Sequence, residues 1–217
     1  MDQSAQDMQT YYSARASYYD AVYLKPERQA DIQFLSAYLP AQFAGRNVLE
    51  IACSTGYWTQ HIAPVTRSML ATDGNADPLS FARQRPGTAH IAFQVADAFA
   101  LENISSEFDA AFAGLWFSHV LKQDQQRFLN GLHSRLQPGA RVIMIDNNAS
   151  QLLDFPITET DADGNTFQHR DLRDGSVHRI LKNFPTEAEL RALVDGCATD
   201  ISYQNLGHFW LFSYTLK

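Results

Sequence analysis

Apolar residues along this chain form short runs, which are separated by stretches with helical spacing. Short apolar runs bounded by turn residues are typical of strands in a sheet that is covered on both faces. They predict strands at 47–52, 68–73, 91–96, 108–114 and 141–146. Because helical or short connecting segments lie between these runs, the pattern predicts an α/β protein with a doubly wound, mostly parallel sheet.

The stretches between the predicted strands carry the apolar spacing and the end signals of helices. The predicted helices cover 26–39, 56–63, 75–85, 122–137 and 187–195. Pro26 suits a first helical turn, and we expect Pro40 and Pro138-Gly139 to end the helices that precede them. Thr186 and Glu189 have the spacing of a capping box, which marks the start of the last helix.

The alternation of strands and helices breaks after the fifth predicted strand. Segments 166–172 and 176–181 flank a turn and predict a β-hairpin. We expect this hairpin to stand near the carboxyl end of strand five, within an insertion over 149–181 on the substrate side. Two further strands, about 199–206 and 208–216, are joined by a short link and are predicted to pair antiparallel.

A tyrosine-rich segment opens the chain, and we interpret 1–40 as a helical cap on a single domain that spans 1–217. Its aromatic residues and one arginine share a face of a predicted helix: Tyr11, Tyr12, Arg15, Tyr18 and Tyr19. Such a face can pack on the edge of the domain. It can also form a lid whose phenol groups reach a bound ligand, and the sequence leaves both readings open.

The charge and the cysteines restrict the partners of the chain. The net charge is −7 and no lysine-rich block is present, so we expect no nucleic-acid partner, because phosphate contacts need clustered cations. No apolar run approaches the roughly 20 residues of a membrane helix, and the N-terminus does not resemble a signal peptide. Cys53 and Cys197 lie in no motif, which favours a reduced, cytoplasmic setting. We expect no membrane association, and a monomer or a homodimer.

One short acidic stretch resembles the start of a calcium-binding loop. It contains Asp161, Asp163 and Asn165. The full loop needs a glutamate at its twelfth position, and Leu172 stands there. We therefore interpret the stretch as a turn and predict no metal site.

The segment Asn47–Trp58 carries the clearest sign of ligand binding, because a buried strand runs into a turn of small residues and then into a helix. Ala52, Ser54 and Gly56 are small at alternate positions, which lets a ligand approach the backbone closely. The N–H groups at the start of the helix would face that ligand. Glu50 adds a carboxylate near the end of the strand. Doubly wound folds hold nucleoside-bearing cofactors in this way.

Two more acidic residues follow predicted strands. Asp73 ends the second strand, and Asp97 comes directly after the third. Because the carboxyl ends of parallel strands meet at one edge of a sheet, we expect both to lie near Glu50. The position of Asp73, about 20 residues after the small-residue turn, is where such folds place the carboxylate that binds ribose hydroxyls.

Together these segments make the chain similar to the class I S-adenosylmethionine-dependent methyltransferases, over roughly residues 10–217. The resemblance is carried by Glu50-Ile-Ala-Cys-Ser-Thr-Gly56, Thr72-Asp-Gly-Asn75, Ala96-Asp-Ala98 and the stretch from Phe108 to Gly139. It implies a seven-stranded sheet in the order 3-2-1-4-5-7-6 with the last strand antiparallel, and S-adenosylmethionine as the cofactor.

The resemblance also implies roles for individual residues. Glu50 and the small-residue turn would hold the methionine part of the cofactor, Asp73 would bind the ribose, and Asp97 would accept from the adenine amino group. The residues expected to contact the cofactor are Tyr19, Glu50, Ala52, Ser54, Gly56, Trp58, Asp73, Gly74, Asp97, Ala98, Phe99 and Gly114. The residues expected to contact the substrate are Tyr11, Tyr12, Trp116, Asn147 and His169.

Ala52 and Ser54 depart from this resemblance, because they stand where the family has glycine. Neither residue adopts a positive φ as readily as glycine does. Either the cofactor binds more weakly here, or the turn never needs those angles. We favour the second interpretation, because Glu50, Asp73 and Asp97 are all present.

The implied reaction is methyl transfer from S-adenosylmethionine to an oxygen or nitrogen nucleophile of a small molecule, by in-line displacement. Such a reaction depends on positioning, and it needs a base only when the nucleophile arrives protonated. His119, just beyond strand four, is the candidate base, with His169, His178 and His208 as rivals. The alternatives are a protein that binds the cofactor without catalysis and a protein or peptide methyltransferase. A nicotinamide-dependent dehydrogenase is disfavoured, because Tyr57 occupies the third glycine position of its motif.

Overall fold

The structure is a computed structural model that describes residues 3–105 and 107–217. Met1, Asp2 and Ser106 lie outside the described residues, so the cap predicted over 1–40 can be followed from Gln3 onward. None of the described helices has both the length and the apolar character needed to cross a membrane.

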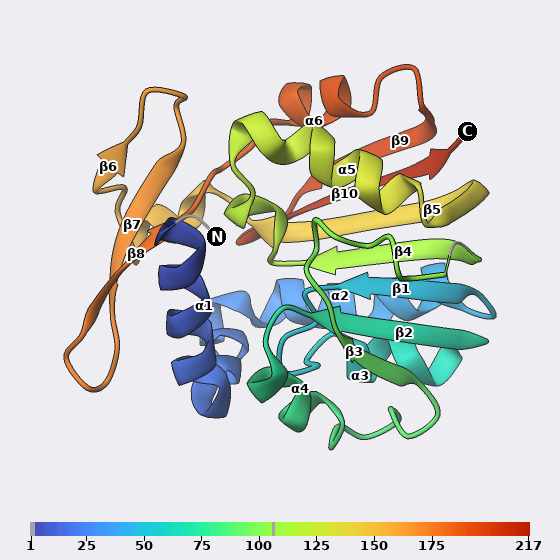
Figure 1. Ribbon diagram of the computed structural model, residues 1–217, viewed down its shortest axis with the longest axis horizontal. Coiled ribbons are helices and arrows are strands. Elements are labelled where there is room, and N and C mark those ends of the chain that lie inside the picture. Colours follow the sequence, from blue (N-terminus) through green and yellow to red (C-terminus); the bar gives the residue numbers. More distant parts are fainter. Residues whose placement is uncertain (1–2, 106) are drawn as a thin grey trace.

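A seven-stranded sheet forms the centre of the molecule, in the order β3-β2-β1-β4-β5-β10-β9 (Figure 1). Its strands are β1 (Asn47–Ile51), β2 (Ser68–Asp73), β3 (Ala92–Val95), β4 (Phe108–Gly114), β5 (Leu136–Asn147), β9 (Ala198–Asn205) and β10 (Phe209–Leu216). The first five run parallel, and β10 runs antiparallel to both of its neighbours. The predicted order and the antiparallel last strand are confirmed.

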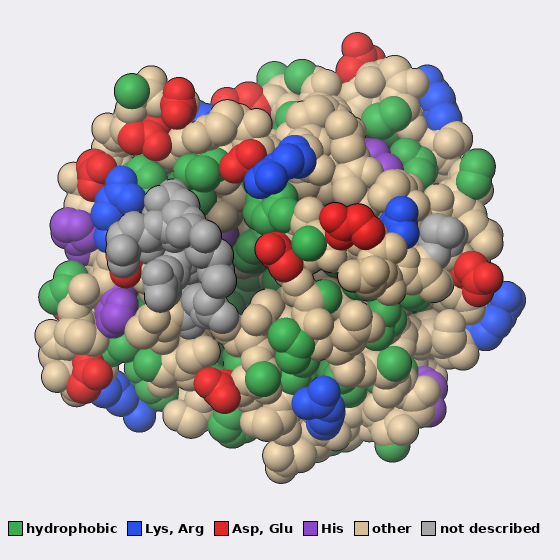
Figure 2. All heavy atoms as spheres, viewed as in Figure 1, with side chains coloured by type: hydrophobic (Ala, Val, Ile, Leu, Met, Phe, Trp, Pro, Cys, Tyr) green, Lys and Arg blue, Asp and Glu red, His purple; other side chains and the backbone are tan. Residues whose placement is uncertain are grey.

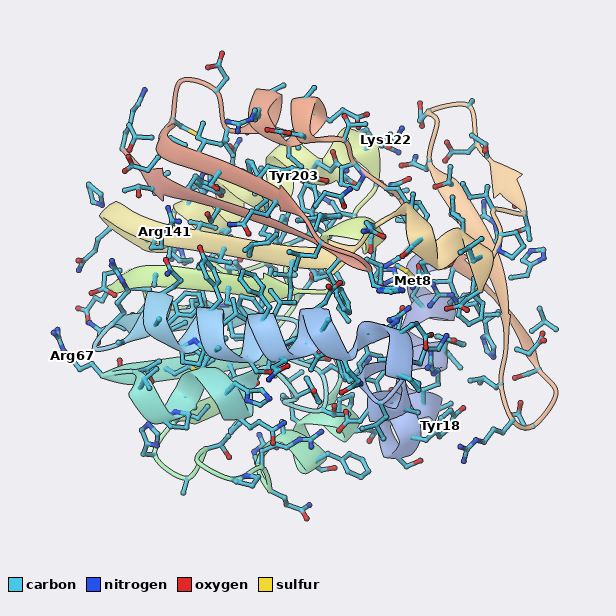
Figure 3. The ribbon with its side chains drawn as sticks, turned by 180° about the vertical axis from the view of Figure 1, so that it is seen from behind. Met8, Tyr18, Arg67, Lys122, Arg141 and Tyr203 are labelled. Atoms are coloured by element: carbon cyan, nitrogen blue, oxygen red, sulfur yellow. The ribbon has the colours of Figure 1, made fainter. Side chains whose placement is uncertain are left out.

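Successive strand residues point to opposite faces of the sheet, and helices cover both faces. On β1, Val48 packs with residues of the helix α2, whereas Leu49 packs with residues of α5 and α6. Figure 3 shows α2 lying along the face that is turned away from the viewer in Figure 1.

The helices are α1 (Gln3–Arg15), α2 (Gln29–Phe43), α3 (Thr59–Ile62), α4 (Ala76–Ala82), α5 (Gln125–His133) and α6 (Glu187–Leu193). The shorter 3-10 segments are η1 (Ala16–Tyr23), η2 (Pro26–Arg28), η3 (Ala63–Val65), η4 (Phe117–His119), η5 (Lys122–Asp124) and η6 (Ala149–Leu153).

Two predicted helix ends are wrong. Pro40 lies inside α2, which continues to Phe43. Proline removes one helical hydrogen bond, but Leu39 and Phe43 on either side of it are fully buried, and this packing keeps the helix intact. Pro138 does not end a helix either: α5 ends at His133, and Pro138 lies in β5 at an exposed position where the register with β4 shifts. A strand tolerates proline at such an irregularity, because no ladder bond is needed from it.

The predicted hairpin is confirmed and forms part of a second sheet. It consists of β7 (Thr166–Asp171) and β8 (Val177–Leu181), with the short strand β6 (Glu159–Thr160) beside β7. Helix α1 packs on this sheet through Tyr11, which contacts Leu172 and Ile180. The N-terminal helix and the insertion therefore lie side by side at the carboxyl ends of the parallel strands (Figure 1). The capping box at the start of α6 is also confirmed.

A buried ion pair joins the second sheet to the first. Lys182, which follows β8, places its Nζ 2.8 Å from Oδ1 of Asp146 near the end of β5, and the side chains are 1% and 0% exposed. The ammonium also donates to Oγ of Ser118 at 2.6 Å. Burial alone would raise the pKa of Asp146, but the Lys182 charge together with the hydrogen bonds from Lys182 and from the Ser118 N–H outweighs burial and lowers this pKa. Burial lowers the pKa of Lys182 to about 8.

We predict that Lys182→Met lowers the free energy of unfolding by about 3–5 kcal/mol, because it leaves the Asp146 carboxylate buried without a counter-charge. Urea denaturation at neutral pH measures this loss. The control is Lys25→Met, which removes the partly exposed Lys25–Asp154 pair and should change the free energy by less than about 1 kcal/mol. Equal, small losses in both variants would contradict the central role of the buried pair.

Candidate active site

The turn between β1 and α3 adopts left-handed backbone angles at alternate residues. The φ angles are 55° at Ala52, 51° at Ser54 and 75° at Gly56. Our expectation that Ala52 and Ser54 avoid these angles is therefore wrong. Each non-glycine residue in this region costs about 1–2 kcal/mol, so the surroundings must hold the turn. The Asp73 carboxylate does so, since its Oδ2 accepts from the Ser54 N–H at 2.9 Å.

The glycines near this turn are required for packing within the protein. A Cβ atom on Gly56 would lie 2.9 Å from the Cα and Cβ of Ala82 in α4. A Cβ on Gly114, at the end of β4, would lie 3.1 Å from the ring of Trp58. Gly56 therefore lets α4 approach the turn, and Gly114 lets Trp58 pack beneath it. Gly74, also a predicted contact, is exposed with open space around its Cα.

The predicted acidic residues lie at the same edge of the sheet. Glu50 is 2% exposed and accepts from Oγ1 of Thr59 at 2.7 Å. Burial raises the pKa of Glu50 to about 8, although the Thr59 hydrogen bond opposes the shift. Burial also raises the pKa of Asp73, although backbone N–H groups donate to it. Asp97 is exposed and accepts from the Phe99 N–H at 2.9 Å.

Aromatic side chains gather beside Asp97. The ring of Phe99 lies 6.4 Å from that of Trp116 and 6.0 Å from that of Phe128. Ala98 is buried next to them, and the buried Nε1 of Trp116 has no hydrogen-bond partner among the described residues. This apolar wall beside a carboxylate suits a flat heterocycle with an amino group.

The segment η1 is fastened to the small-residue turn. The ring of Tyr23 stacks on that of Tyr57 with centroids 3.7 Å apart. The Asp20 carboxylate accepts from Oγ1 of Thr55 at 2.7 Å and pairs with Arg85. The aromatic residues of the N-terminal segment pack on the domain, as the first interpretation predicts. The second interpretation, a lid over a bound ligand, stays a prediction.

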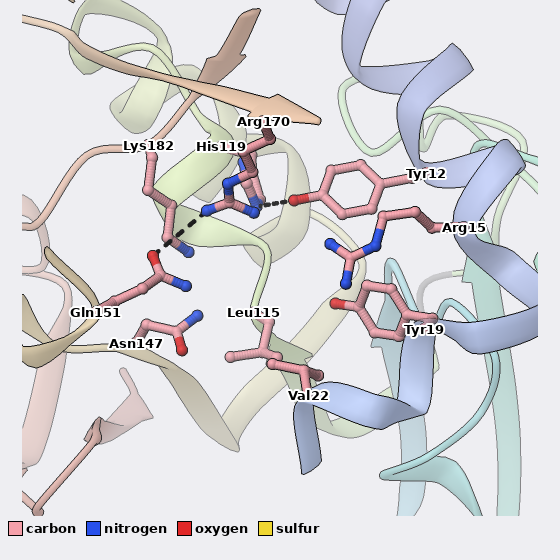
Figure 4. A pocket seen from close by; sticks show the side chains of 10 residues that line it. All are labelled: Tyr12, Arg15, Tyr19, Val22, Leu115, His119, Asn147, Gln151, Arg170 and Lys182. Carbon is pink, nitrogen blue, oxygen red and sulfur yellow. Dashed lines mark hydrogen bonds between the residues drawn. The ribbon is translucent and has the colours of Figure 1, made fainter. Parts of the chain in front are cut away.

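A polar pocket lies between α1, η1, the end of β5 and the second sheet (Figure 4). Its lining residues are Tyr12, Arg15, Tyr19, Val22, Leu115, His119, Asn147, Gln151, Arg170 and Lys182. Four of the predicted site residues, Tyr12, Tyr19, His119 and Asn147, are brought together here.

Other predicted substrate contacts lie elsewhere. Tyr11 is 2% exposed and packs into the second sheet. His169 is exposed, because strand residues alternate and β7 turns Gln168 and Arg170 inward instead. Trp116 faces the aromatic group beside Asp97.

The sequence predictions missed six of the pocket residues as site residues: Arg15, Val22, Leu115, Gln151, Arg170 and Lys182. The alternation of the predicted hairpin could have placed Arg170 on the inner face. Two of the rival candidates for the base have contacts outside the pocket. His178 forms a hydrogen bond with Ser176, and His208 lies beside Asp31.

Both ring nitrogens of His119 are engaged. Nδ1 lies 2.6 Å from the Leu181 carbonyl oxygen, which can only accept, so Nδ1 carries the proton. Nε2 therefore accepts from the Tyr12 hydroxyl at 2.9 Å. Burial lowers the pKa of His119 to about 3, and the nearby Lys182 charge adds to this effect. The imidazole is thus a neutral hydrogen-bond acceptor.

Adjacent residues connect the pocket with the small-residue turn. Tyr19 lines the pocket, and the next residue, Asp20, is bonded to Thr55 in the turn. Leu115 lines the pocket directly after β4, which pairs with β1. A molecule in the pocket would therefore lie beside a ligand held at the turn.

The sequence matches known methyltransferases. A model of the family described as methyltransferase domain matches residues 48–139. An uncharacterized methyltransferase of Schizosaccharomyces pombe is 26% identical in an alignment of 113 residues that covers 48% of this chain and 39% of that protein. The matched region therefore spans well under half of that relative's length.

Solved structures match over nearly the whole chain. The DhpI-SAM-HEP complex is 27% identical with a TM-score of 0.77 and covers 100% of both chains. The DhpI-SAH complex is 26% identical with a TM-score of 0.76 and covers 97% of this chain and 96% of that one. The N-methyltransferase NodS from Bradyrhizobium japonicum WM9, in complex with S-adenosylhomocysteine, shares the fold at 14% identity, with a TM-score of 0.68 and coverage of 97% and 98%.

These comparisons identify S-adenosylmethionine as the cofactor. The edge of the sheet fits this molecule, which carries a positive charge at its sulfonium and at its ammonium group. Glu50 is buried with a single neutral donor and a raised pKa, and such a carboxylate is stabilised when a cation approaches. The aromatic wall beside Asp97 suits the adenine.

The raised pKa of Glu50 gives a pH-dependent prediction for the cofactor-free protein. Between about pH 4.5 and pH 8 the folded protein binds one proton more than the unfolded chain at Glu50, so stability falls as the pH rises through this window. Glu50→Gln removes this titration. At pH 8 we expect the free energy of unfolding of this variant to exceed that of the wild type by about 1–3 kcal/mol. We also expect the variant to bind S-adenosylmethionine more weakly. Denaturation at pH 5 and at pH 8 measures the difference, and parallel pH curves for the two proteins would refute it.

The left-handed angles of the turn give a second prediction. Ala52→Gly and Ser54→Gly should keep cofactor affinity within about threefold, because glycine adopts these angles without strain. Ala52→Val should lower the free energy of unfolding by about 1–2 kcal/mol, since a branched residue resists a positive φ. The matched control is Ala92→Val, at an exposed position in β3, where we expect little change. Isothermal titration and denaturation measure both quantities, and equal stability of the two valine variants would argue against strain at Ala52.

Proposed function

Because the chain belongs to the class I S-adenosylmethionine-dependent methyltransferases, we propose that it transfers the cofactor's methyl group to an oxygen or nitrogen atom of a small molecule. The observation that carries this proposal is the polar pocket next to the small-residue turn. Adjacent residues, Tyr19 and Asp20, connect the pocket and the turn. An acceptor in the pocket would thus be held against a cofactor at the sheet edge.

The bound cofactor would supply an activated methyl group, and the residues of the chain position both reactants. Glu50, which accepts from Thr59, would hold the methionine part, and Asp73, which accepts from the Ser54 N–H, would hold the ribose. Asp97, Phe99 and the backbone of Ala98 would bind the adenine. Holding two reactants at attack distance supplies much of the rate enhancement in such a displacement.

The enclosure of the pocket favours a small acceptor. Tyr12, Tyr19 and Val22 wall it on the N-terminal side, and Arg170 and Lys182 wall it on the side of the second sheet. The stacked rings of Tyr23 and Tyr57 lie at the turn beside it. A protein or peptide methyltransferase needs an open channel for a chain, and side chains that wall the pocket on two sides argue against such a channel.

We keep His119 as a candidate residue for acting at the acceptor, but in a role narrower than that of a general base. Its neutral ring holds the Tyr12 hydroxyl at the pocket wall, and its lowered pKa makes it a weak base. We therefore propose that His119 positions Tyr12. An acceptor that arrives deprotonated needs no stronger base.

The first experiment is binding of S-adenosylmethionine by isothermal titration. Asp73→Asn should weaken binding by roughly 10- to 100-fold, because it removes the charge from a bond to the ribose worth about 1.5–3 kcal/mol. The control is Asp77→Asn, at an exposed position in α4, which should bind as the wild type does. Absence of binding by the wild type would refute the proposed enzyme.

The second experiment tests transfer. The wild type is incubated with methyl-labelled S-adenosylmethionine and a panel of small alcohols, amines, carboxylates and phosphate esters. It should give a labelled product and S-adenosylhomocysteine. Cofactor binding without transfer to any class would favour the non-catalytic alternative.

A further inference from the structure

Three cationic side chains converge on the pocket of a chain whose net charge is −7. Arg15 comes from α1, Arg170 from β7, and Lys182 follows β8; Figure 4 shows all three beside one shared space. Lys182 is paired with Asp146. On the face drawn in Figure 2, by contrast, the coloured lysine and arginine side chains are scattered among acidic ones. The pocket therefore gathers cationic side chains from three separate segments of the chain.

Arg170 has only neutral partners among the described residues. It is 5% exposed, and its Nε and Nη2 donate to the amide oxygen of Gln168, with Nη2 also 3.4 Å from that of Gln151. Its guanidinium lies over the ring of Phe155 at 4.8 Å. Among the described residues no carboxylate pairs with it, and its Nη1 donates no hydrogen bond. A buried guanidinium held only by neutral groups is ready to receive an anion.

The guanidinium of Arg15 also contacts neutral groups. Its Nη1 donates to the Tyr11 hydroxyl at 2.7 Å, and its guanidinium lies 5.1–5.9 Å from the ring centres of Tyr11, Tyr18 and Tyr19. Burial raises the pKa of Tyr19, so this phenol stays neutral. Within the described part of the chain, Arg15 forms no ion pair with a carboxylate.

Neutral donors complete the pocket. The Tyr19 hydroxyl has no hydrogen-bond partner among the described residues. The side-chain oxygen of Asn147 accepts from Arg28 at 3.2 Å, which leaves its NH₂ group to donate. Asp146, the bonded partner of Lys182, is not one of the lining residues, and Lys182 and backbone N–H groups already use its oxygens. The pocket therefore presents N–H and O–H groups with positive charge, the complement of an oxyanion.

We propose that the methyl acceptor is a small organic oxyanion, a molecule with a carboxylate or phosphoryl group, and that Arg15 and Arg170 bind this group. This inference rests on the methyl transfer proposed above. It names the class of substrate and adds two arginines as specificity-determining residues.

The proposed acceptor also accounts for the lack of a strong base in the pocket. An ionised oxygen is already a nucleophile, so no proton has to be removed. The new bond joins this oxygen to the methyl carbon as the bond from carbon to sulfur breaks, and the electron pair of that bond stays on the sulfur of the departing S-adenosylhomocysteine. The product is a methyl ester with one negative charge fewer, which the arginines hold less tightly.

The test measures anion binding in the absence of turnover. The protein is saturated with S-adenosylhomocysteine, and inorganic phosphate and acetate are titrated in separate experiments at constant ionic strength, followed by calorimetry. We expect at least one of the two anions to bind the wild type. Arg15→Gln and Arg170→Gln should each weaken this binding at least about 10-fold, and Arg170→Lys should restore part of it. The matched control is Arg67→Gln, at an exposed residue on the far side of the molecule (Figure 3), which should bind as the wild type does.

The outcomes are distinguishable. Binding of phosphate alone assigns a phosphoryl acceptor, and binding of acetate alone assigns a carboxylate. If neither anion binds the loaded wild type, or if both glutamine variants bind as it does, the oxyanion proposal is overturned while the methyl-transfer proposal stands. Failure of the wild type to bind S-adenosylhomocysteine would instead overturn the methyl-transfer proposal. Unchanged affinity of the glutamine variants for this cofactor shows that they are folded.

Discussion

The buried pair of Asp146 and Lys182 determines how the two sheets meet. Desolvating two charges is expensive, and their attraction compensates only when the geometry is good and further hydrogen bonds are made. Here Ser118 and backbone N–H groups complete the set. With Lys182 fixed, β8 is fixed, and β7 then presents Arg170 to the pocket. The N-terminal helix packs on the same sheet, so the pocket wall on that side depends on the pair as well.

A second constraint acts on the small-residue turn. Two non-glycine residues stay at left-handed angles because the Asp73 carboxylate binds the Ser54 N–H and the neighbouring strand binds Cys53. Asp73 therefore has a structural role besides its proposed contact with the ribose. Local strain of this kind is common at binding sites, where the surrounding structure holds the backbone in place.

The sequence predicted those features that depend on local pattern. The strand order, the hairpin and the capping box at Thr186 follow from periodicity, turn residues and family resemblance. It failed at Pro40 and Pro138, where tertiary packing or an irregular ladder overrides the usual effect of proline. The pocket was harder to predict, because its walls come from segments that are more than 100 residues apart in the chain. Tyr12 meets His119 and Arg170 only after the insertion folds back over β5, and no local signal in the sequence encodes that contact.

The proposed site has two adjoining halves that would receive groups of opposite charge. Glu50 and Asp73 would line the half for the cationic cofactor, and Arg15 and Arg170 line the half that would receive an anionic acceptor. Transfer of a methyl group from a sulfonium to an oxyanion annihilates one charge of each sign. Water stabilises the separated charges of the reactants and so opposes this step. A pocket that excludes water stabilises them less and therefore opposes the step less. In the proposed reaction, the tyrosines beside the turn, Tyr23 and Tyr57, and those in the pocket wall, Tyr12 and Tyr19, would therefore act on the methyl transfer as well as on binding, by reducing the contact with water.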